Sequence, residues 1–439
     1  MGKQIVKPSI LPGFMELLPS DQILFNKIMD TIRKNYEKFG FIPIDTPLIE
    51  KSEVLLAKGG GETEKQIYRF LKGDTDLSLR FDLTVPLARY VSQHFSSLTF
   101  PFRRYQIGKV YRGERNQKGR CRDFYQCDID IIGNGSLSII NDAEIPSVIY
   151  STFKDLGFDT FTIHINNRKV LNGFFDAFDI SSKGDVLRTI DKMDKIGIDA
   201  VIEELGNLGL SRETIDKVLN FIGIKGSNDD VLSALDMLGI ENPVFTEGLK
   251  ELKQVVHYIR CFNVPEKNFA IDLTIARGLD YYTGTVYETI LDDYPGIGSV
   301  CSGGRYDNLA EYYTTQKLPG VGISIGLTRL FYQLREANII ETNASSTLSQ
   351  VLITPMDDNI EYSINIANML RDNGIITEIY FDNVKLGKKF SYADKLGIPF
   401  VIIIGTDEIQ SSQLSVKNIK TGEQSKVSFE EAVKIIKNL

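Results

Sequence analysis

The stretch that decides the fold is Ala276-Arg277-Gly278-Leu279-Asp280-Tyr281-Tyr282-Thr283-Gly284-Thr285-Val286-Tyr287-Glu288. It combines one arginine, two acidic residues and three tyrosines with two glycines. From Thr283 to Glu288, β-branched and aromatic residues alternate, which predicts a strand. A guanidinium beside glycine at the start of a strand can hold a phosphate, because its planar fork donates two parallel hydrogen bonds. A structural ion pair with surface tyrosines is the competing interpretation, since ion-pair networks gather the same residue types.

A second unusual stretch is the basic run from Arg103 to Arg122. It contains eight basic residues and one acid, Glu114, a net of +7 in a chain whose formal net charge is −8. Tyr105–Tyr111 and Phe124–Ile132 flank its centre as strand-like segments, and Asn116-Gln117-Lys118-Gly119 has the composition of a turn. These segments predict a hairpin with a long cationic loop, which suits a polyphosphate or the end of a nucleic acid. A solvated basic face is the alternative.

Together these stretches resemble the class II aminoacyl-tRNA synthetases, and within them the histidyl-tRNA synthetase family. The resemblance covers nearly the whole chain. Its most specific part is the pair of histidine-specific motifs, because Arg-Gly-Leu-Asp-Tyr-Tyr and Gly-Gly-Arg-Tyr-Asp occur in this order and at this spacing. In chain order, the matching segments are Phe41–Glu50 (first class II motif), Phe102–Gly133 (second class II motif), Ala276–Glu288 (first histidine motif), Ser302–Asp307 (second histidine motif) and Gly320–Leu330 (third class II motif).

The resemblance implies that the chain uses ATP, together with Mg²⁺, to activate an amino acid. Arg112 and Arg277 are implied as the catalytic residues at the α-phosphate, where two guanidiniums would offset the repulsion between phosphate and attacking carboxylate. Arg329 follows a glycine-bearing strand at the predicted start of a helix, where the backbone permits close approach. No residue pattern predicts a metal site made by the protein. The implied ATP-binding residues are Arg112, Glu114, Arg120, Phe124, Arg277 and Arg329.

The resemblance also implies a pocket for L-histidine. In it, a carboxylate near one imidazole nitrogen and hydroxyls near the other would reject a phenyl ring, because buried polar groups would lose their partners. Asp128 and Asp130 are two residues apart in a predicted strand, so both face one side of it. Some family members carry glutamate where this chain has Asp82 and Asp130. The implied histidine-binding residues are Asp82, Thr84 and Gln126 at the α-amino end, and Asp130, Tyr281, Tyr282 and Tyr306 towards the side chain.

Length and composition agree with these expectations. A chain of 439 residues with 42% hydrophobic residues predicts two to three domains with ample cores. No segment offers 18 consecutive apolar residues, and Met1–Leu11 lacks the apolar region of a signal peptide, so we expect no membrane span and a cytoplasmic protein. The four cysteines form no Cys-x-x-Cys pair. We therefore expect structural thiols in a reducing compartment and no zinc site.

The predicted fold is an α+β catalytic core, the class II antiparallel sheet flanked by helices, with a helical insertion and a carboxy-terminal α/β domain. In that last domain, predicted strands alternate with helices at Ile360–Asp372 and Lys385–Leu396, an order that predicts a largely parallel sheet. The predicted domains are the core in two parts, residues 1–166 and 259–340, the insertion, residues 167–258, a linker, residues 341–350, and an anticodon-binding domain, residues 351–439.

The function that the resemblance implies is a histidine–tRNA ligase, which forms histidyl-adenylate and transfers histidine to tRNA(His). The rival is a non-catalytic relative, either a regulatory subunit of histidine biosynthesis or a sensor of uncharged tRNA. Such relatives tend to lose the arginine motif or the last domain, and this chain keeps both. A ligase that uses no tRNA is a third possibility, which the last domain disfavours. Phe41–Glu50 is too apolar for a free surface strand, and with Pro47 it predicts a homodimer interface.

Overall fold

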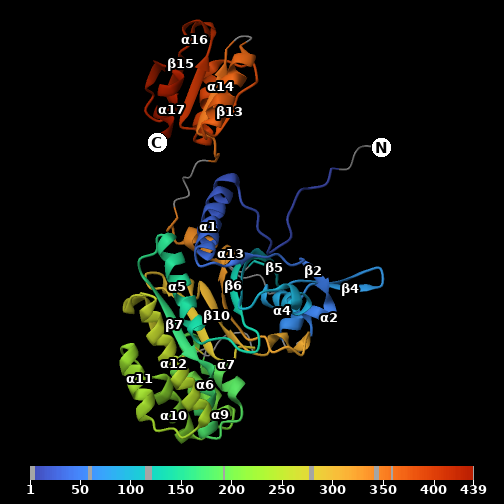
Figure 1. The fold of residues 1–439 in the computed structure, drawn as a ribbon, viewed down its shortest axis with the longest axis vertical. Coiled ribbons are helices and arrows are strands. Elements are labelled where there is room, and N and C mark those ends of the chain that lie inside the picture. The colour runs from blue at the N-terminus through green and yellow to red at the C-terminus, as the bar shows by residue number, and fades with distance from the viewer. Residues whose placement is uncertain are drawn as a thin grey trace. The chain divides into compact units, whose positions relative to one another are not determined.

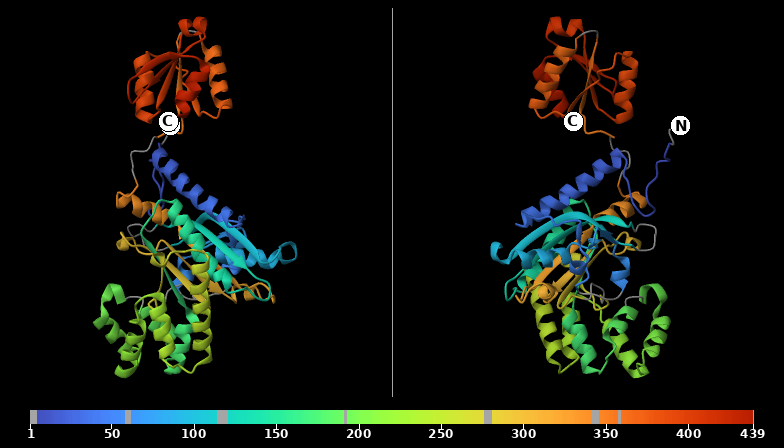
Figure 2. Two further views of the ribbon diagram at one scale, coloured as in Figure 1. Left: turned by 60° about the vertical axis from the view of Figure 1, so that its left-hand side comes forward. Right: turned by 90° about the vertical axis from the view of Figure 1, so that its right-hand side faces the viewer.

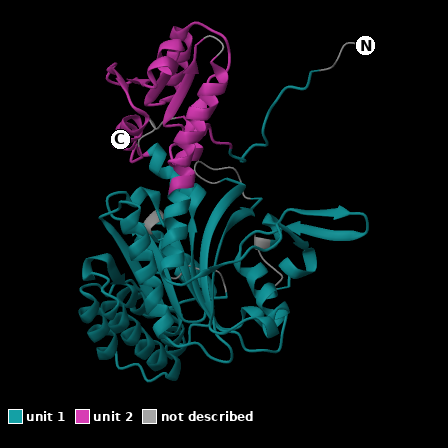
Figure 3. Ribbon diagram, turned by 45° about the horizontal axis from the view of Figure 1, so that its top comes forward, with its two compact units in different colours: residues 1–15, 28–336 teal, residues 16–27, 337–439 magenta. Residues whose placement is uncertain are grey.

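The computed structural model describes residues 5–57, 62–113, 121–190, 193–275, 281–340, 346–356 and 359–438. The centre of the predicted cationic loop (114–120), the segment 276–280 and part of the predicted linker (341–345) lie outside these ranges. Contacts divide the chain into two compact units, which Figure 3 colours separately. Unit 1 comprises residues 1–15 and 28–336, and unit 2 comprises residues 16–27 and 337–439.

The centre of unit 1 is an eight-stranded sheet (Figures 1 and 2). Its strand order is β1-β5-β6-β11-β10-β9-β7-β8. The edge pairs β1–β5 and β7–β8 are parallel, and the five pairs between them are antiparallel. The strands are β1 (Ile42–Pro43), β5 (Phe102–Tyr111), β6 (Asp123–Ile132), β7 (Phe161–Asn167), β8 (Phe269–Ile271), β9 (Thr285–Leu291), β10 (Cys301–Tyr306) and β11 (Gly320–Gly326).

Strands β5 and β6 form the predicted hairpin, paired from Phe102↔Ile132 to Tyr111↔Asp123. Alternation along β6 separates two kinds of side chain. Ile129 and Ile131 are fully buried in the core, whereas Asp128 and Asp130 line a cavity. The period of two therefore puts acidic groups on the cavity side of a strand whose other side is apolar.

Four helices pack with this sheet: α1 (Pro19–Lys38), of which residues from Ile28 onward belong to unit 1, α4 (Thr84–Gln93), α5 (Ile140–Asp155) and α13 (Leu327–Glu336). The Tyr36 hydroxyl on α1 donates to the carbonyl oxygen of Cys127 on β6 at 2.9 Å. This bond satisfies a buried hydroxyl and fixes the helix against the sheet. The spacing of apolar residues predicts helices over Leu18–Phe39, Leu83–Phe95 and Asn141–Leu156. The structure confirms them as α1, α4 and α5, within about two residues at each end. Among the described helices, none is long and apolar enough to cross a bilayer.

The helices from α6 to α12 follow β7 and form one lobe of unit 1 (Figures 1 and 2). Capping residues explain where several of them begin: the side chain of Ser227 accepts from the backbone of Asp230, and that of Asn242 accepts from Val244. The helices are α6 (Arg168–Ala177), α7 (Lys183–Ile190), α8 (Met193–Ile196), α9 (Ile198–Asn207), α10 (Arg212–Ile222), α11 (Asn228–Met237) and α12 (Pro243–Cys261).

A smaller three-stranded sheet in unit 1 has the order β2-β4-β3, with β2 (Ile49–Lys51), β3 (Arg69–Lys72) and β4 (Thr75–Leu79). The short helices α2 (Ser52–Leu55) and α3 (Glu62–Gln66) connect its strands. Large apolar side chains are exposed on this sheet, on the edge strand β1 and between them. They are Ile42, Leu48, Ile49, Phe70 and Leu71.

Unit 2 contains a five-stranded sheet of order β13-β12-β14-β15-β16. Strands β13, β12 and β14 are parallel as predicted, but β14–β15 and β15–β16 are antiparallel, so the predicted largely parallel sheet is wrong for its second half. The strands are β12 (Val351–Pro355), β13 (Thr377–Ile379), β14 (Phe400–Ile404), β15 (Leu414–Asn418) and β16 (Gln424–Val427). The helices are α14 (Ile360–Asp372), α15 (Leu386–Leu396), α16 (Thr406–Ser411) and α17 (Phe429–Lys437).

Candidate active site

A cavity of about 400 Å³ opens on unit 1 beside strands β6, β10 and β11. It collects residues that are far apart in the sequence, including ten of the thirteen predicted site residues. The other three, Glu114, Arg120 and Arg277, lie outside the described residues. The ten are Asp82, Thr84, Arg112, Phe124, Gln126, Asp130, Tyr281, Tyr282, Tyr306 and Arg329.

One end of the cavity is cationic and aromatic. The Arg112 Nε donates to the carbonyl oxygen of Phe81 at 3.0 Å, and its guanidinium lies over the Phe124 ring, 5.1 Å from the centroid. Arg329 is the third residue of α13, directly after β11, and its Nη2 donates to the carbonyl oxygen of Ile297 at 3.4 Å. Guanidiniums and an aromatic face in one cavity suit a nucleotide, because they match its phosphates and its base.

The floor of the cavity carries three carboxylates, Asp82, Asp128 and Asp130, and one of them pairs with a buried guanidinium outside the cavity lining. Asp130 contacts the fully buried Arg104, whose Nη2 lies 2.5 Å from Asp130 Oδ2. Burial raises the pKa of Asp128 to about 7 and that of Asp130 to about 6, although the Arg104 guanidinium favours both charged forms. Burial also raises the pKa of Asp82, against its hydrogen bonds to backbone amides at the start of α4. A cationic ligand would relieve this accumulation of buried acid groups.

Three tyrosines form a wall beside the acidic floor. The ring centroids of Tyr281 and Tyr282 are 5.0 Å apart, and those of Tyr281 and Tyr306 are 5.9 Å apart. Both pairs are edge-to-face, a favourable arrangement for aromatic rings. The Tyr306 hydroxyl donates to Asp130 Oδ1 at 2.7 Å. The wall therefore presents rigid rings whose hydroxyls are held by neighbouring polar groups.

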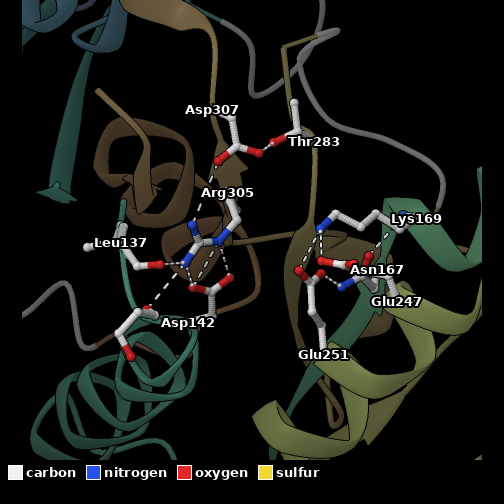
Figure 4. Close-up of polar contacts among 10 residues, drawn as sticks. Leu137, Asp142, Asn167, Lys169, Glu247, Glu251, Thr283, Arg305 and Asp307 are labelled. Atoms are coloured by element: carbon white, nitrogen blue, oxygen red, sulfur yellow. Dashed lines mark hydrogen bonds and ion pairs between the residues drawn. The ribbon is translucent and has the colours of Figure 1, made fainter. Parts of the chain in front are cut away.

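A buried polar network is centred on Arg305, the residue before Tyr306 (Figure 4). Arg305 Nε donates to Asp142 Oδ1 at 3.0 Å, its Nη2 donates to Asp142 Oδ2 at 2.6 Å, and the same Nη2 donates to the Leu137 carbonyl oxygen at 3.1 Å. The backbone of Thr283 donates to the Arg305 carbonyl oxygen at 2.8 Å. A Cβ added at Gly284 would lie 2.9 Å from Arg305 Cδ, so this position requires glycine.

A second polar network, around Lys169 and Glu251, lies near the segment that contains Thr283 and Gly284 (Figure 4). Lys169 Nζ lies 2.6 Å from Glu251 Oε1 and 3.3 Å from Glu247 Oε1, while Asn167 Nδ2 donates to Glu251 Oε2 at 2.9 Å. The adjacent backbone amide of residue 168 donates to the Gly284 carbonyl oxygen at 2.9 Å. Helices α6 and α12 thus support the residues that follow Tyr282.

Three basic residues of the run belong to strand β5, outside the hairpin loop. Lys109 lies in the predicted strand-like segment Tyr105–Tyr111, and the strand also includes Arg103 and Arg104. Each pairs with a carboxylate: Arg103 with Glu144 at 2.8 Å, Arg104 with Asp130 at 2.5 Å and Lys109 with Asp123 at 2.8 Å. The charges of these three residues are therefore neutralised by carboxylates of the same chain. The basic residues left for the predicted cationic loop are those from Arg112 onward.

Asp128, which lines the cavity, and Arg104, which pairs with Asp130, were missed as site residues. Arg104 was counted with the basic run, and Asp128 was noted only for its strand face. The signal that could have found both is cross-strand pairing, since Arg104 lies opposite Asp130 and Gln106 lies opposite Asp128 in the β5–β6 hairpin. Among the described residues, no group of three or more His, Cys, Asp or Glu side chains could hold a metal ion.

The sequence model of the histidyl-tRNA synthetases matches residues 13–330, and that of an anticodon binding domain matches residues 350–439. The chain belongs to the histidyl-tRNA synthetase family. A histidine–tRNA ligase of Clostridium tetani is 73% identical over 438 residues, which cover 100% of both chains. A histidine–tRNA ligase of Clostridium acetobutylicum is 51% identical and covers 97% of this chain and 99% of its own.

A solved structure gives the same result. The crystal structure of histidyl-tRNA synthetase from Nostoc sp. PCC 7120 matches with a TM-score of 0.92 at 43% identity, over 99% of this chain and 100% of that one. The predicted histidyl-tRNA synthetase family, the class II fold with a carboxy-terminal anticodon-binding α/β domain, and the enzyme class, an aminoacyl-tRNA synthetase, are confirmed. The predicted domain boundaries and the roles of individual site residues stay predictions.

Proposed function

We propose that this chain activates L-histidine with ATP and transfers the resulting histidyl group to tRNA(His). The observation that carries the proposal is that one cavity contains groups suited to ATP and groups suited to histidine. Guanidiniums and an aromatic ring, suited to ATP, share it with an acidic floor and a tyrosine wall, suited to an ammonium and an imidazole. Close relatives named histidine–tRNA ligase support the same conclusion.

The first step is in-line attack of the histidine carboxylate on the α-phosphate. Arg112, at the nucleotide end of the cavity, would neutralise the charge that develops on that phosphate, and Arg277 is proposed as the second such group. Phe124 offers a face for the adenine ring, with Glu114 proposed at its amino group. Arg329 and Arg120 are proposed at the γ-phosphate. Holding both reactants aligned accounts for much of the expected rate enhancement.

The amino acid would lie with its ammonium at the acidic floor. Asp82, Thr84 and Gln126 are proposed at the ammonium, and Asp130, Tyr281, Tyr282 and Tyr306 are proposed around the side chain. Mg²⁺ would enter bound to ATP. The described residues offer the carboxylate of Glu288 at the cavity wall and no complete protein cage, which fits a metal held mainly by the substrate's phosphates.

The non-catalytic alternative is not favoured. Arg112 and Arg329 both line the cavity, and the sequence keeps Arg277. A regulatory or sensing relative has no need of guanidiniums at a reacting phosphate. The family match extends over residues 350–439, which supports a role for unit 2 in binding the anticodon of tRNA(His).

The same reasoning supports a homodimer. Exposed apolar side chains gather along Phe41–Glu50 and the adjacent small sheet, and β1 ends the eight-stranded sheet with Ile42 52% exposed. A contiguous apolar surface next to a sheet edge favours a partner. A symmetric pair through this surface would cover it. The cytoplasmic location expected from the sequence stays a prediction.

The test of the proposed function is amino-acid-dependent exchange of pyrophosphate into ATP, followed by charging of tRNA(His). Exchange should require histidine and should be nearly absent with the other amino acids. Arg277→Ala should remove most exchange while the fold survives, because its interaction forms chiefly in the transition state. Arg33→Ala, which removes an exposed arginine on α1, is the matched control. Lack of any histidine-dependent exchange by the wild type would defeat the proposal.

A further inference from the structure

The amino-terminal segment lies against the end of the β5–β6 hairpin, next to residues of the cavity. Residues 5–12 are exposed, whereas Gly13, Phe14 and Met15 are partly buried. Backbone groups of Gly13 and Met15 bond to Arg122 and Asp123, where the chain enters strand β6. The three partly buried residues therefore contact the chain immediately before the predicted adenine-binding position.

Two successive backbone hydrogen bonds connect this segment to Arg112. The Arg122 amide donates to the Gly13 carbonyl oxygen at 2.7 Å, and the Arg112 amide donates to the Arg122 carbonyl oxygen at 2.8 Å. Arg112 lines the cavity, and its Nε is held by the Phe81 carbonyl oxygen at 3.0 Å. Arg122 thus links Gly13 to an arginine at the nucleotide end of the cavity.

A carboxylate makes a second connection. Asp123 Oδ1 accepts from the Met15 amide at 3.3 Å, and Asp123 Oδ2 lies 2.8 Å from Lys109 Nζ. Asp123 is buried and directly precedes Phe124, whose ring lies under the Arg112 guanidinium. Both groups that face a nucleotide at this end therefore adjoin residues that the amino-terminal segment holds.

The hairpin needs support at this point because its own strand pairing stops there. The last pair of the β5–β6 ladder is Tyr111↔Asp123, so Arg112 and Arg122 lie just beyond it. Residues past the end of a ladder open easily unless other segments bind them. Catalysis tolerates little such motion, since a displacement of about 1 Å can cost about 100-fold in rate.

The conformation of Gly13 is adapted to this contact. Its φ is +85°, in the left-handed region that residues other than glycine rarely adopt. A Cβ at this position would lie 3.1 Å from both Cγ and Cδ of Arg122. The Phe14 amide donates to the Leu11 carbonyl oxygen at 3.1 Å and closes a turn around it. Glycine thus allows a turn that directs a carbonyl oxygen at the Arg122 amide.

We propose that Gly13–Met15 is a positioning segment, which holds Arg112 at the α-phosphate of ATP by fixing Arg122 and Asp123. The described residues that line the cavity include none of the three, so the segment acts through its neighbours. This inference rests on the proposed function, which puts ATP at this end of the cavity. If the segment only anchored the amino terminus, its loss would reduce stability and leave the rate of the chemical step unchanged.

The test measures histidyl-adenylate formation by variants of the full chain, as the first burst of pyrophosphate release. Gly13→Pro is the main variant. Proline fixes φ at about −65°, so residue 13 cannot keep its carbonyl oxygen on the Arg122 amide. The burst rate should fall about 10-fold or more, because Arg112 loses its alignment. The KM for histidine should change less than about two-fold, since its proposed site is elsewhere in the cavity.

Ser9→Pro is the matched control, because it places a proline in the exposed part of the same segment. Its burst rate should equal that of the wild type. The amplitude of the burst separates positioning from folding, since it counts competent sites and the rate reports their chemistry. Gly13→Pro should keep the amplitude and lose rate. A merely structural segment would give a lower amplitude and melting temperature at an unchanged rate.

Equal burst rates in the wild type and Gly13→Pro overturn the inference and leave the proposed function intact. A similar fall in Ser9→Pro also overturns it, because that residue lies outside the contact. If Gly13→Pro does not fold, Met15→Pro takes its place. That variant removes the amide that donates to Asp123, and a wild-type burst rate in it again overturns the inference. Absence of histidine-dependent pyrophosphate release by the wild type overturns the proposed function and this inference together.

Discussion

Single residues on the cavity floor oppose folding and favour binding. Asp82, Asp128 and Asp130 are all nearly inaccessible to solvent, and Arg104 is their one fully buried cation within the described residues. Such an excess of acid is costly in the empty protein, because buried carboxylates lose their hydration. Active sites often keep groups of this kind at the expense of stability.

The floor makes a pH-dependent prediction. The pKa of Asp128 is about 7 in the folded chain and about 3.9 in the unfolded chain. Between these values the folded state binds the extra proton, so the free energy of unfolding falls as pH rises from about 4 to about 7. Asp128→Asn cannot titrate, so its stability does not fall in this way as pH rises. The melting temperature of the variant minus that of the wild type should therefore increase from pH 5 to pH 8, measured without histidine.

The control for that measurement is Asp216→Asn, which changes an exposed carboxylate on α10. Its melting temperature should follow the wild type across the range. If the plots of melting temperature against pH are parallel for the wild type and Asp128→Asn, the prediction is wrong. The Asp128 carboxyl would then have the same pKa in the folded and the unfolded chain.

The buried pair of Arg305 and Asp142 makes a stability prediction. Asp142 is fully buried and accepts three of the hydrogen bonds that Arg305 donates. Asp142→Asn removes the nearer and more buried of the two carboxylates beside the guanidinium, since Asp307 Oδ1 lies 3.8 Å from Arg305 Nη1. Breaking this buried pair should cost about 3 to 5 kcal/mol of unfolding free energy. Urea unfolding followed by circular dichroism would measure it.

Glu213→Gln provides the matched comparison on the surface. Glu213 pairs with Lys217 at 2.7 Å along one exposed helix face. Exposed pairs of this kind contribute little to stability, because water and salt screen them. A loss of similar size in both variants would mean that Arg305 finds other partners when Asp142 changes.

The sequence predicted the residues of the site better than their contacts. Motif positions identified the tyrosines, Gln126 and Arg112, because residue type and order alone carry that information. Which acid pairs with the buried Arg104 could not be read from the sequence. That outcome depends on the β5–β6 register, which places Arg104 opposite Asp130.

At the scale of elements, strand β11 shows how backbone alone can shape a cavity. Gly322 lies between Gly304 on β10 and Asp130 on β6. A Cβ at Gly322 would lie 2.2 Å from the Ile129 carbonyl oxygen and 2.3 Å from Asp130 Oδ1. No side chain fits there without moving a neighbouring strand or the acid itself.

Gly322→Ala should therefore destabilise the fold by at least about 1 to 3 kcal/mol, as overpacking does. It should also weaken histidine binding, because Asp130 must move. Gly326→Ala, four residues along the same strand, is the control, since its Cβ would meet nothing closer than Arg329 Cβ at 4.0 Å. Thermal melting of both variants with and without histidine tests this, and equal melting temperatures would refute the steric account.

Helices and strands could be predicted where a hydrophobic pattern repeats over many residues. They were missed where the pattern covers only a few residues. Helices α1, α4 and α5 and the β5–β6 hairpin carry patterns over ten or more residues. Strands β15 and β16 span only five and four residues, and their pairing direction depends on a turn and not on hydrophobic pattern. The parallel half of the sheet in unit 2 could be predicted from alternation with helices, and the antiparallel half could not.

At the scale of the whole molecule, chemistry and tRNA binding are expected to separate. The proposed adenylation residues all precede residue 341, and residues 350–439 match an anticodon binding domain. Residues 348–439 carry 10 basic and 12 acidic residues, a net charge of −2, so attraction to RNA should rest on local contacts with a single-stranded loop. Within the Lys385–Lys389 run at the start of α15, the exposed Lys385 and Lys388 are the best local candidates. Lys389 of the same run is buried, and its Nζ donates to the Pro355 carbonyl oxygen at 2.8 Å, so it is not available to RNA.

Deletion of residues 348–439 should therefore weaken charging of tRNA(His) much more than histidine-dependent pyrophosphate exchange. Circular dichroism would first establish that the truncated chain is folded. Equal loss in both assays would mean that the deleted part supports the core. Unimpaired charging would remove its proposed part in tRNA binding.

The apolar surface at Ile42, Leu48, Ile49, Phe70 and Leu71 predicts assembly at the same scale. Sedimentation should find a dimer at micromolar concentration, because covering these side chains removes apolar area from water. Leu71→Glu, at the most exposed of them, should shift the chain towards monomer, whereas Met237→Glu, at an exposed apolar residue of α11, should not. A wild type that sediments only as monomer would contradict the prediction.

The tyrosine wall also makes the cavity visible to ultraviolet spectroscopy. The chain has no tryptophan, so tyrosine dominates its near-ultraviolet absorption and its fluorescence. Burial and neighbouring acids raise the pKa of Tyr281, Tyr282 and Tyr306 above that of ordinary tyrosine. In a gradual titration with alkali, these phenols should remain un-ionised after the surface tyrosines have become phenolates. A substrate that enters the cavity can thus be followed by its effect on the native chromophores, without any attached dye.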